Sequence, residues 1–414
     1  MNRTTATGYY DYNYITALQK VTNHEINPNK KLPRERFWRI RSKEVILAQG
    51  AFERPLVFSG NDKPGIMMAS AAQVYMSQYG VLPGNSITLF TNNDHAYSVA
   101  LEANLKGAKV IIIDIRHSVS ETINKLCEEN KIETYVSHAI TSTYGSKKVN
   151  AITVQELSSD KQSFVGEAVT IGTDLLLMSG GWNPAVQLFS QSRGKLRYSD
   201  EISSFVPDVL IDHQYVVGCN NGEFNLRQSL LNSFQAGISA AHQTGHKIEV
   251  NQFIDDAVEP YGFTISDVVP YVLGSKPVTH GSKHFIDFQN DVTAADIFLA
   301  QREGYVSVEH TKRYTTTGMA TDQGKTSNVN ALAIMSHIQN KPVGEVGHTT
   351  FRPPYAPQTF GAIAGRNVDQ YFDPERRTAI HQWHIDNGAV FEDVGQWKRP
   401  HFYPKNKESM NEAV

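Results

Sequence analysis

The chain has 414 residues, of which 40% are hydrophobic and 20% are charged, and its formal net charge is −3. This length and composition predict two or three globular domains with a sizeable core, and the small net charge provides no general attraction to nucleic acid or membranes. The two cysteines, Cys127 and Cys219, are too far apart in the sequence to indicate a disulfide scaffold, a zinc cluster or an iron–sulfur centre with cysteine ligands. Neither a signal-peptide core at the N-terminus nor an apolar run of membrane-span length is present, so we expect a cytoplasmic location.

Alternating apolar runs and turns predict an α/β arrangement in the first 114 residues. A buried strand is expected at 44–48 and an alanine-rich helix at 67–79. A strand at 86–90, a helix at 96–106 and a strand at 109–114 then follow in order. The last strand is continuously apolar, which is typical of the middle of a parallel sheet.

The same alternation continues to residue 246. We expect the following elements in order: a helix at 118–129, strands at 133–136, 174–179, 209–211 and 214–217, and a helix at 225–241. The strand at 174–179 runs into Gly180 and Gly181, which permit a tight turn and a close approach by another backbone or a cofactor. A plain turn between a strand and the next element is the alternative for this junction.

These elements predict an α/β fold with two interleaved Rossmann-like dinucleotide-binding domains. Residues 1–85 and 181–246 form parts of the first domain, and residues 86–180 form the second, inserted one. A connector at 247–285, a small helical module at 286–345 and a final segment at 346–414 complete the predicted organisation.

The spacing of residues 87–114 is that of a dinucleotide-binding unit. Its second strand ends at Asp114, near the usual interval of about 20 residues after the first strand, where a carboxylate binds a ribose hydroxyl. Asn92 and Asn93 lie in the turn that carries glycines in the usual fingerprint, and Asp94 beside them would repel an anion. An α/β unit that binds no nucleotide is the alternative.

Residues 318–326, Gly-Met-Ala-Thr-Asp-Gln-Gly-Lys-Thr, come within one residue of a nucleotide-binding P-loop. That motif needs four residues between its glycines, but five residues (319–323) separate Gly318 from Gly324. The preceding residues 312–317 are polar, so no hydrophobic strand leads into the motif. The sequence therefore excludes an ATP cradle here.

Several motifs resemble the α subunit of heterotetrameric sarcosine oxidase. In chain order they are 50–56 (GAFERPL), 61–67 (NDKPGIM), 90–94 (FTNND), 179–184 (SGGWNP) and 285–293 (FIDFQNDVT). The resemblance covers essentially the whole chain, and the Thr-Asn-Asn-Asp turn is shared with the family. It implies NAD binding, with Asn92, Asn93, Asp114, Gly180 and Gly181 as the candidate residues.

The helical module is similar to the ferredoxin domain of the bacterioferritin-associated type, which holds a two-iron two-sulfur cluster. The corresponding places carry Asp287, Gln289 and Asp322 instead of cysteines, so no such cluster can be ligated. In the family an FMN lies at the boundary between the α and β subunits. The resemblance therefore suggests FMN contacts for the polar loop at Thr321, Lys325 and Thr326, and a solvated structural loop is the alternative.

The C-terminal segment resembles the start of an aminomethyltransferase-like, folate-binding domain whose body is absent from this sequence. His381 and His384 have a spacing found in metal sites, but no third ligand accompanies them, and no metal is expected. The family's α subunit begins upstream with a glycine-rich fingerprint, so we expect an internal segment or a truncated chain.

The resemblance implies a complex with β, γ and δ subunits that oxidises sarcosine to glycine and gives formaldehyde or methylene-tetrahydrofolate with hydrogen peroxide. This chain would contribute NAD binding, a flavin interface and assembly contacts, and we assign it no catalytic residue. Two alternatives stay open: the α subunit of a related FAD-dependent amino-acid dehydrogenase, and a non-catalytic assembly fragment.

Overall fold

The computed structural model describes residues 1–161, 163–248, 278, 281 and 283–413. These residues form two compact units, which are composed of Met1–Thr5, Ala17–Trp38 and Pro357–Val414 in one and of Ala6–Thr16 and Arg39–Ala356 in the other. Most of the predicted connector at 247–285 lies outside the described residues. No helix in the described ranges combines the length and the apolar character needed to cross a membrane.

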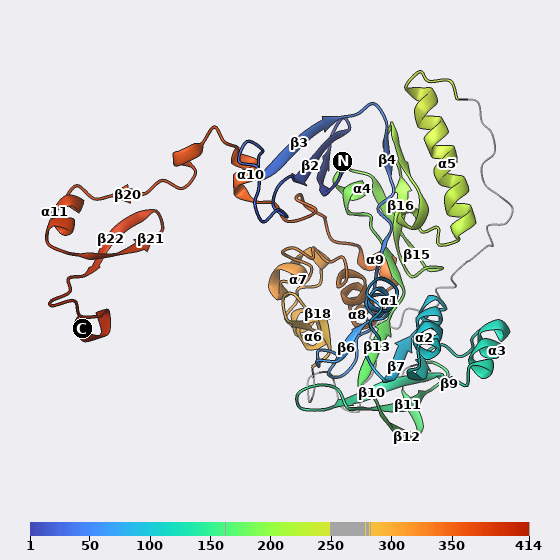
Figure 1. The fold of residues 1–414 in the computed structure, drawn as a ribbon. Coiled ribbons are helices and arrows are strands. Elements are labelled where there is room, and N and C mark those ends of the chain that lie inside the picture. Colours follow the sequence, from blue (N-terminus) through green and yellow to red (C-terminus); the bar gives the residue numbers. More distant parts are fainter. Residues whose placement is uncertain (162, 249–277, 279–280, 282, 414) are drawn as a thin grey trace. The chain divides into compact units, whose positions relative to one another are not determined.

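A five-stranded parallel sheet is the centre of the larger unit (Figure 1). Its order is β6 (Ile66–Met68), β13 (Leu175–Ser179), β7 (Ser86–Thr91), β8 (Lys109–Asp114) and β9 (Glu133–Val136). The helices that follow its strands are α1 (Ala69–Gln78), α2 (His95–Leu105) and α3 (Glu121–Glu129). The predicted strands and helices between residues 67 and 136 are therefore confirmed, with α3 beginning where the Ser120 side chain accepts a hydrogen bond from the Ile123 N–H.

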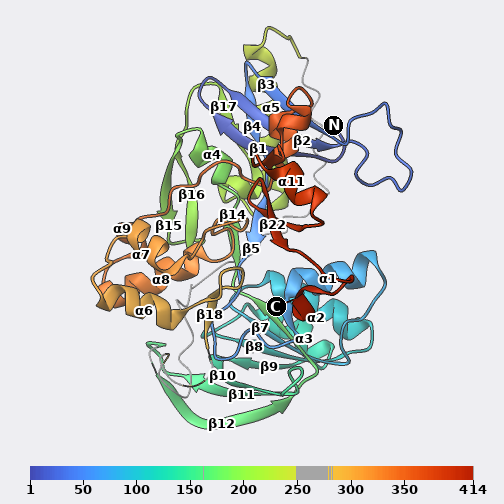
Figure 2. The same cartoon turned by 90° about the vertical axis from the view of Figure 1, so that its left-hand side faces the viewer.

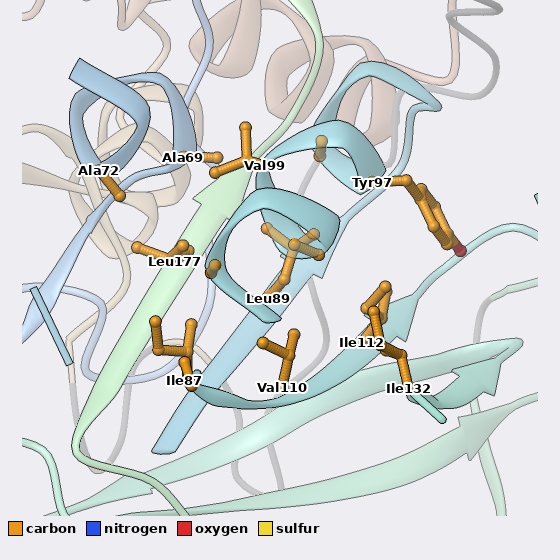
Figure 3. Close-up of a cluster of buried hydrophobic side chains, with 14 of the residues drawn as sticks. Ala69, Ala72, Ile87, Leu89, Tyr97, Val99, Val110, Ile112, Ile132 and Leu177 are labelled. Atoms are coloured by element: carbon orange, nitrogen blue, oxygen red, sulfur yellow. The ribbon is translucent and has the colours of Figure 1, made fainter. Parts of the chain in front are cut away.

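Both faces of this sheet are buried, which explains the continuous apolar run in β8. One face packs on α1 and α2, as Figure 3 shows for Leu89, Ile112 and Leu177. Residues of the opposite parity, such as Phe90 and Ile113, belong to a second core on the other face. Because side chains alternate along a strand, one short sequence supplies both cores.

An antiparallel sheet covers that second face and was not predicted from the sequence (Figure 2). Its strands are β10 (His138–Tyr144), β11 (Ala151–Leu157) and β12 (Phe164–Gly172). Ala139, Ile140, Ile152 and Val154 are fully buried against the parallel sheet, whereas most of β12 is exposed. A half-exposed strand carries a weak apolar signal, which is why this region lacked a sequence prediction.

Shorter strands form three two-stranded sheets in the same unit. The pairs are β4 (Val45–Leu47) with β17 (Gln214–Val216), β5 (Ala51–Glu53) with β14 (Trp182–Pro184), and β15 (Lys195–Ser199) with β16 (Ser204–Val209). The helices here are α4 (Gln187–Gln191), η1 (Gly218–Asn221) and α5 (Leu226–Gln243). The predicted strand at 209–211 is wrong: β16 ends at Val209, because Phe205 and Val206 pack in the core while Leu210 is half exposed.

The helical module contains a short hairpin and four helices. They are β18 (Phe285–Asp287), β19 (Val292–Thr293), α6 (Ala294–Arg302), α7 (Val308–Thr315), α8 (Asn328–Gln339) and α9 (Val343–Val346). Its core includes Ile297, Leu332 and Ile334, all of which are buried. The prediction of helices in this stretch is confirmed.

The remaining elements lie towards the two ends of the chain. A three-stranded sheet contains β1 (Thr4–Tyr10), β2 (Tyr14–Lys20) and β3 (Glu35–Arg41). The C-terminal elements are α10 (Phe360–Ala364), η2 (Asp369–Tyr371), β20 (Arg376–Arg377), α11 (His381–Asp386), β21 (Val390–Val394), β22 (Trp397–Phe402) and α12 (Met410–Ala413).

Candidate functional site

The carboxyl edge of the parallel sheet contains a topological switch point between β7 and β13. The chain runs from β7 to β8 on one side, and β13, which comes later, pairs with the other side of β7. In open α/β sheets, ligands bind in the crevice outside such a point. The turns that leave these two strands carry Asn92, Asn93, Gly180 and Gly181.

The structure brings these four residues together. The Asn92 Nδ2 donates a hydrogen bond to the Gly180 carbonyl at 3.3 Å, and the Asn93 Nδ2 donates to the carbonyl of Ser179 at 3.2 Å. Both asparagine side chains are almost fully buried. The amides therefore join the two turns from within, so a ligand at this edge would contact the turns rather than the amide groups themselves.

The Gly180–Gly181 turn also depends on a close backbone approach. A Cβ atom at Gly180 would lie 2.9 Å from the Pro55 carbonyl oxygen, and Gly181 has a φ of +93°. Both requirements favour glycine. The sequence prediction of a tight junction is consistent with this geometry, although neither requirement involves a cofactor.

Arg54 supports the same turn and was missed in the sequence analysis. Its Nε donates to the Gly180 carbonyl at 2.9 Å, and its Nη1 donates to the Asn183 Oδ1 at 3.1 Å and to the Ser203 carbonyl at 2.9 Å. The side chain is 1% exposed, and burial lowers the pKa of Arg54 to about 10. The only early signal was its place in the Gly-Ala-Phe-Glu-Arg-Pro-Leu motif, which indicates no particular partner.

Asp114 lies at the end of β8 in a buried ionic network. Its carboxylate accepts hydrogen bonds from the Tyr97 hydroxyl at 2.8 Å and from the Arg116 Nη2 at 2.7 Å, and the Arg116 Nη1 contacts the Asp94 Oδ1 at 2.7 Å. Asp114 is fully buried. A ribose hydroxyl would therefore have to displace one of these partners to reach it.

Arg116 also changes the electrostatics expected for Asp94. Burial by itself would lower the pKa of Arg116, but its hydrogen bonds and ion pairs with Asp114 and Asp94 outweigh burial and raise it. The guanidinium thus stays charged and is shared by Asp114 and by Asp94 beside the N-terminus of α2, so it offsets part of their negative charge. The repulsion of an anion expected from the sequence is consequently weakened.

Trp182 and His95 lie at the partly exposed border of this edge. Their rings are 5.1 Å apart in an edge-to-face arrangement, and burial lowers the pKa of His95. The Trp182 Nε1 has no hydrogen-bond partner within the described ranges. A buried indole N–H usually finds an acceptor, so this donor is a physical reason to expect a bound group here.

The former P-loop candidate connects two helices, α7 and α8, rather than a strand and a helix. Gly318 and Gly324 have positive φ angles, and Cβ atoms there would lie 2.4 Å and 2.0 Å from the Asn328 side chain. The Asn328 amide, which donates to the Thr349 Oγ1 at 2.6 Å, occupies the space enclosed by the loop. This helix–loop–helix context differs from that of a P-loop, and the glycines serve the packing of Asn328.

The three predicted flavin-contact residues belong to this loop but face internal partners. The Lys325 Nζ donates to the carbonyls of Thr321 at 3.1 Å and Tyr355 at 3.0 Å, and it lies 4.5 Å from the Tyr355 ring centroid. The Thr326 hydroxyl donates to the Asp322 Oδ1 at 3.2 Å. The Asn183 Nδ2 donates to the Lys325 carbonyl at 3.1 Å, which links the loop to the Gly180–Gly181 turn.

The residues at the places of the ferredoxin cysteines form a hydrogen-bonded group. The Gln289 Oε1 accepts from the Asp322 N–H at 2.6 Å, and the Gln289 Nε2 donates to the Thr321 hydroxyl. The fully buried Asp287 accepts from the Gly318 N–H at 2.8 Å. Direct hydrogen bonds therefore hold together the segments that a cluster would bridge.

The cysteines and the paired histidines are on elements that carry none of these site residues. Cys127 is on α3 and Cys219 is on η1, and both are free thiols. His381 packs 4.6 Å from the Phe391 ring, and His384 hydrogen-bonds to the Tyr403 hydroxyl. The two histidines therefore make different local contacts.

Comparison with known proteins identifies the relatives of the chain. Residues 281–366 match the sarcosine oxidase A3 domain family. The chain is 40% identical over 418 residues to sarcosine oxidase subunit alpha from Corynebacterium sp. (strain U-96), covering 100% of this chain and 43% of that protein. It is 37% identical to the Rhizobium meliloti (strain 1021) subunit alpha, covering 98% of this chain and 39% of that protein. The chain therefore spans less than half the length of these relatives.

A solved structure supports the fold. L-proline dehydrogenase from P. horikoshii superposes with a TM-score of 0.59 at 17% identity, covering 87% of this chain and 64% of that chain. The prediction of an α/β fold is thereby confirmed. The A3 domain and the identities of 37–40% along the chain make the protein a homologue, over its whole length, of the α subunits of sarcosine oxidases.

Proposed function

We propose that the carboxyl edge between β7 and β13 is an NAD-binding site within an α subunit of a sarcosine oxidase. The observation that carries this proposal is the unpartnered Trp182 indole N–H at the switch point of a parallel sheet. The pairing of Asp94 with Arg116 adds support, because it reduces the negative charge that would oppose a phosphate at the N-terminal end of α2.

The residues of the edge would have different roles in holding the dinucleotide. The α2 N-terminus would face the pyrophosphate, and Trp182 would donate to an acceptor on the ligand. Asn92, Asn93 and Gly180 would support the binding turns, with Gly181 leaving room for close approach. Contact between Asp114 and a ribose stays a prediction that requires Tyr97 or Arg116 to move.

NAD titration of the purified chain tests this site. We expect the Trp182→Phe variant to bind NAD about tenfold more weakly, because one hydrogen bond contributes about 0.5–1.5 kcal/mol. Trp397→Phe is the matched control, since Trp397 lies on β22 and is 45% exposed. Isothermal titration would measure the affinities. Equal affinity of both variants, or no NAD binding by the chain alone or co-expressed with a β subunit, would rule the site out.

We further propose that the loop with Thr321, Lys325 and Thr326 contacts an FMN at the boundary with the β subunit. An ammonium group has three N–H donors, and Lys325 directs two of them to the carbonyls of Thr321 and Tyr355. The third donor is left for a flavin or phosphate oxygen. Thr321 and Thr326 supply hydroxyl groups on the same loop.

Flavin retention in the enzyme reconstituted with its β subunit tests the loop contact. Lys325→Met should lower FMN affinity about tenfold, because a hydrogen bond from a charged group contributes about 1.5–3 kcal/mol. Lys341→Met removes an exposed lysine of the same module and serves as the control. Flavin absorbance after gel filtration gives the retained fraction. Unchanged retention in Lys325→Met would eliminate this contact.

The activity of the whole complex follows as part of the same proposal. It would oxidise sarcosine to glycine, with formaldehyde or methylene-tetrahydrofolate and hydrogen peroxide as further products, together with β, γ and δ subunits. When bound, the flavin supplies the redox chemistry, and this chain contributes nucleotide binding and subunit contacts. Residues 346–414 would begin the folate-binding domain.

A further inference from the structure

A cavity of about 250 Å³ lies in the helical module, on α7 and the loop that follows it. Three cationic side chains line it: Lys312 and Arg313 from α7, and Arg352 from the segment after α9. Glu309 is the only acidic residue among its described lining residues. The cavity therefore has a formal charge of +2 along its wall.

The partners of these side chains leave this charge uncompensated. Lys312 and Arg352 make no hydrogen bond or ion pair within the described ranges, whereas Arg313 lies 3.9 Å from Glu309. The Glu309 carboxylate also accepts from the Thr350 N–H at 2.8 Å. Burial lowers the pKa of Lys312, and the positive charges of Arg352 and Arg313 lower it further against the opposing effect of Glu309.

The helix dipole explains only part of this arrangement. Lys312 and Arg313 are in the last turn of α7, where cations interact favourably with the partial negative charge of the helix end. That effect does not account for Arg352, which belongs to a different segment, or for the cavity between them. Like charges that converge without counterions are unfavourable, so an anion would stabilise the group.

We propose that this cavity binds a phosphate group in its dianionic form. The +2 charge of the cavity wall balances the −2 charge of the ligand. Two guanidinium groups supply the planar pairs of donors that suit phosphate oxygens. About 10–15 Å³ of such space accommodates one water molecule, so the volume suffices for a phosphate group with associated water. Thr350 also lines the cavity, and its hydroxyl is a neutral group that can donate a hydrogen bond.

This site does not rest on the NAD proposal or on the flavin contact, because Thr321, Lys325 and Thr326 are not among its lining residues, although other residues of the same loop line it. Lys325 lies over Tyr355 and lines a different cavity with Asn183 and Asn328. The sequence placed Lys312, Arg313 and Lys325 in one polar stretch. The tertiary structure separates them and adds Arg352 to the first two.

Phosphate binding to the full chain tests the proposal. Isothermal titration with inorganic phosphate should detect binding that becomes about tenfold weaker in Lys312→Gln and in Arg352→Gln, since each removes one charge-assisted contact. Arg302→Gln is the matched control, because it removes an exposed cation of α6 in the same module. Arg352→Lys keeps the charge and should retain most of the affinity. This result would show that the loss of affinity in Arg352→Gln does not arise from misfolding.

A second comparison identifies the source of the phosphate group. If FMN binds more tightly than inorganic phosphate while riboflavin, which lacks the phosphate, does not bind, the ligand is a flavin or a similar phosphate ester. Equal affinities for FMN and inorganic phosphate indicate free phosphate, and both results support the site. No phosphate binding by the wild-type chain, or equal affinity in Lys312→Gln, Arg352→Gln and Arg302→Gln, would overturn it.

Discussion

Replacing Arg116 with methionine is expected to lower the free energy of unfolding by about 3–5 kcal/mol, the usual cost of leaving a buried carboxylate without its partner. Asp114 is fully buried and receives bonds from three groups of Arg116: the backbone N–H, Nε and Nη2. Methionine fills a similar volume but cannot compensate the charge. Urea-induced unfolding followed by circular dichroism would measure the loss.

Two further variants separate burial from simple ion pairing. Lys125→Met breaks an ion pair with Glu121 that is also short, at 2.8 Å, but both of its side chains are exposed. It should change stability by less than about 1 kcal/mol, as exposed pairs do. Adding Asp114→Asn to Arg116→Met should restore part of the loss, because it removes the uncompensated charge. A similar loss in Arg116→Met and Lys125→Met would contradict the buried-pair explanation.

Gly324→Ala is expected to be the most damaging single change in the loop between α7 and α8. The residue has a φ of +77°, which costs an alanine about 1–2 kcal/mol. A Cβ there would lie 2.0 Å from the Asn328 side chain, which would have to abandon its hydrogen bond to Thr349. Losing that buried bond adds about 1–3 kcal/mol, measurable as a lower urea midpoint.

Gly304→Ala isolates the backbone part of this cost. Gly304 has a φ of +91°, but no atom lies within 4 Å of the position its Cβ would take. Its substitution should therefore cost only about 1–2 kcal/mol. In an Asn328→Ala background, Gly324→Ala should cost no more than Gly304→Ala does in the wild type. A cost that stays high without the Asn328 amide would mean that the clash is not its cause.

The loop at 318–326 shows what the spacing of two glycines can and cannot predict. The extra residue between Gly318 and Gly324 was sufficient to reject a phosphate cradle. The sequence did not reveal what the glycines do. Asn328 comes after the loop in sequence, and only the folded chain places its side chain beside both glycines, where it donates a hydrogen bond to Thr349. A local pattern does not specify which later side chain will occupy a loop.

The sheet edge illustrates the complementary case. The runs at 86–90, 109–114 and 174–179 predicted strands of an α/β unit, the second of them continuously apolar as in a parallel sheet, and parallel strands place their following turns at one edge. The grouping of Asn92, Asn93, Gly180 and Gly181 could therefore be anticipated. Arg54 could not, because its acceptors at Gly180, Asn183 and Ser203 lie more than a hundred residues away.

By itself, the sequence determined the order of the central strands and helices, the helices of the module at 286–345 and the resemblance to sarcosine oxidase α subunits. These conclusions depend on local periodicity, residue chemistry and motif order, which a linear pattern contains. The tertiary structure alone decided that Arg116 pairs with both Asp94 and Asp114 and that Arg352 joins Lys312 and Arg313 around a cavity. Such contacts form only when separate segments pack, because the side chains acquire their partners and lose water at that step.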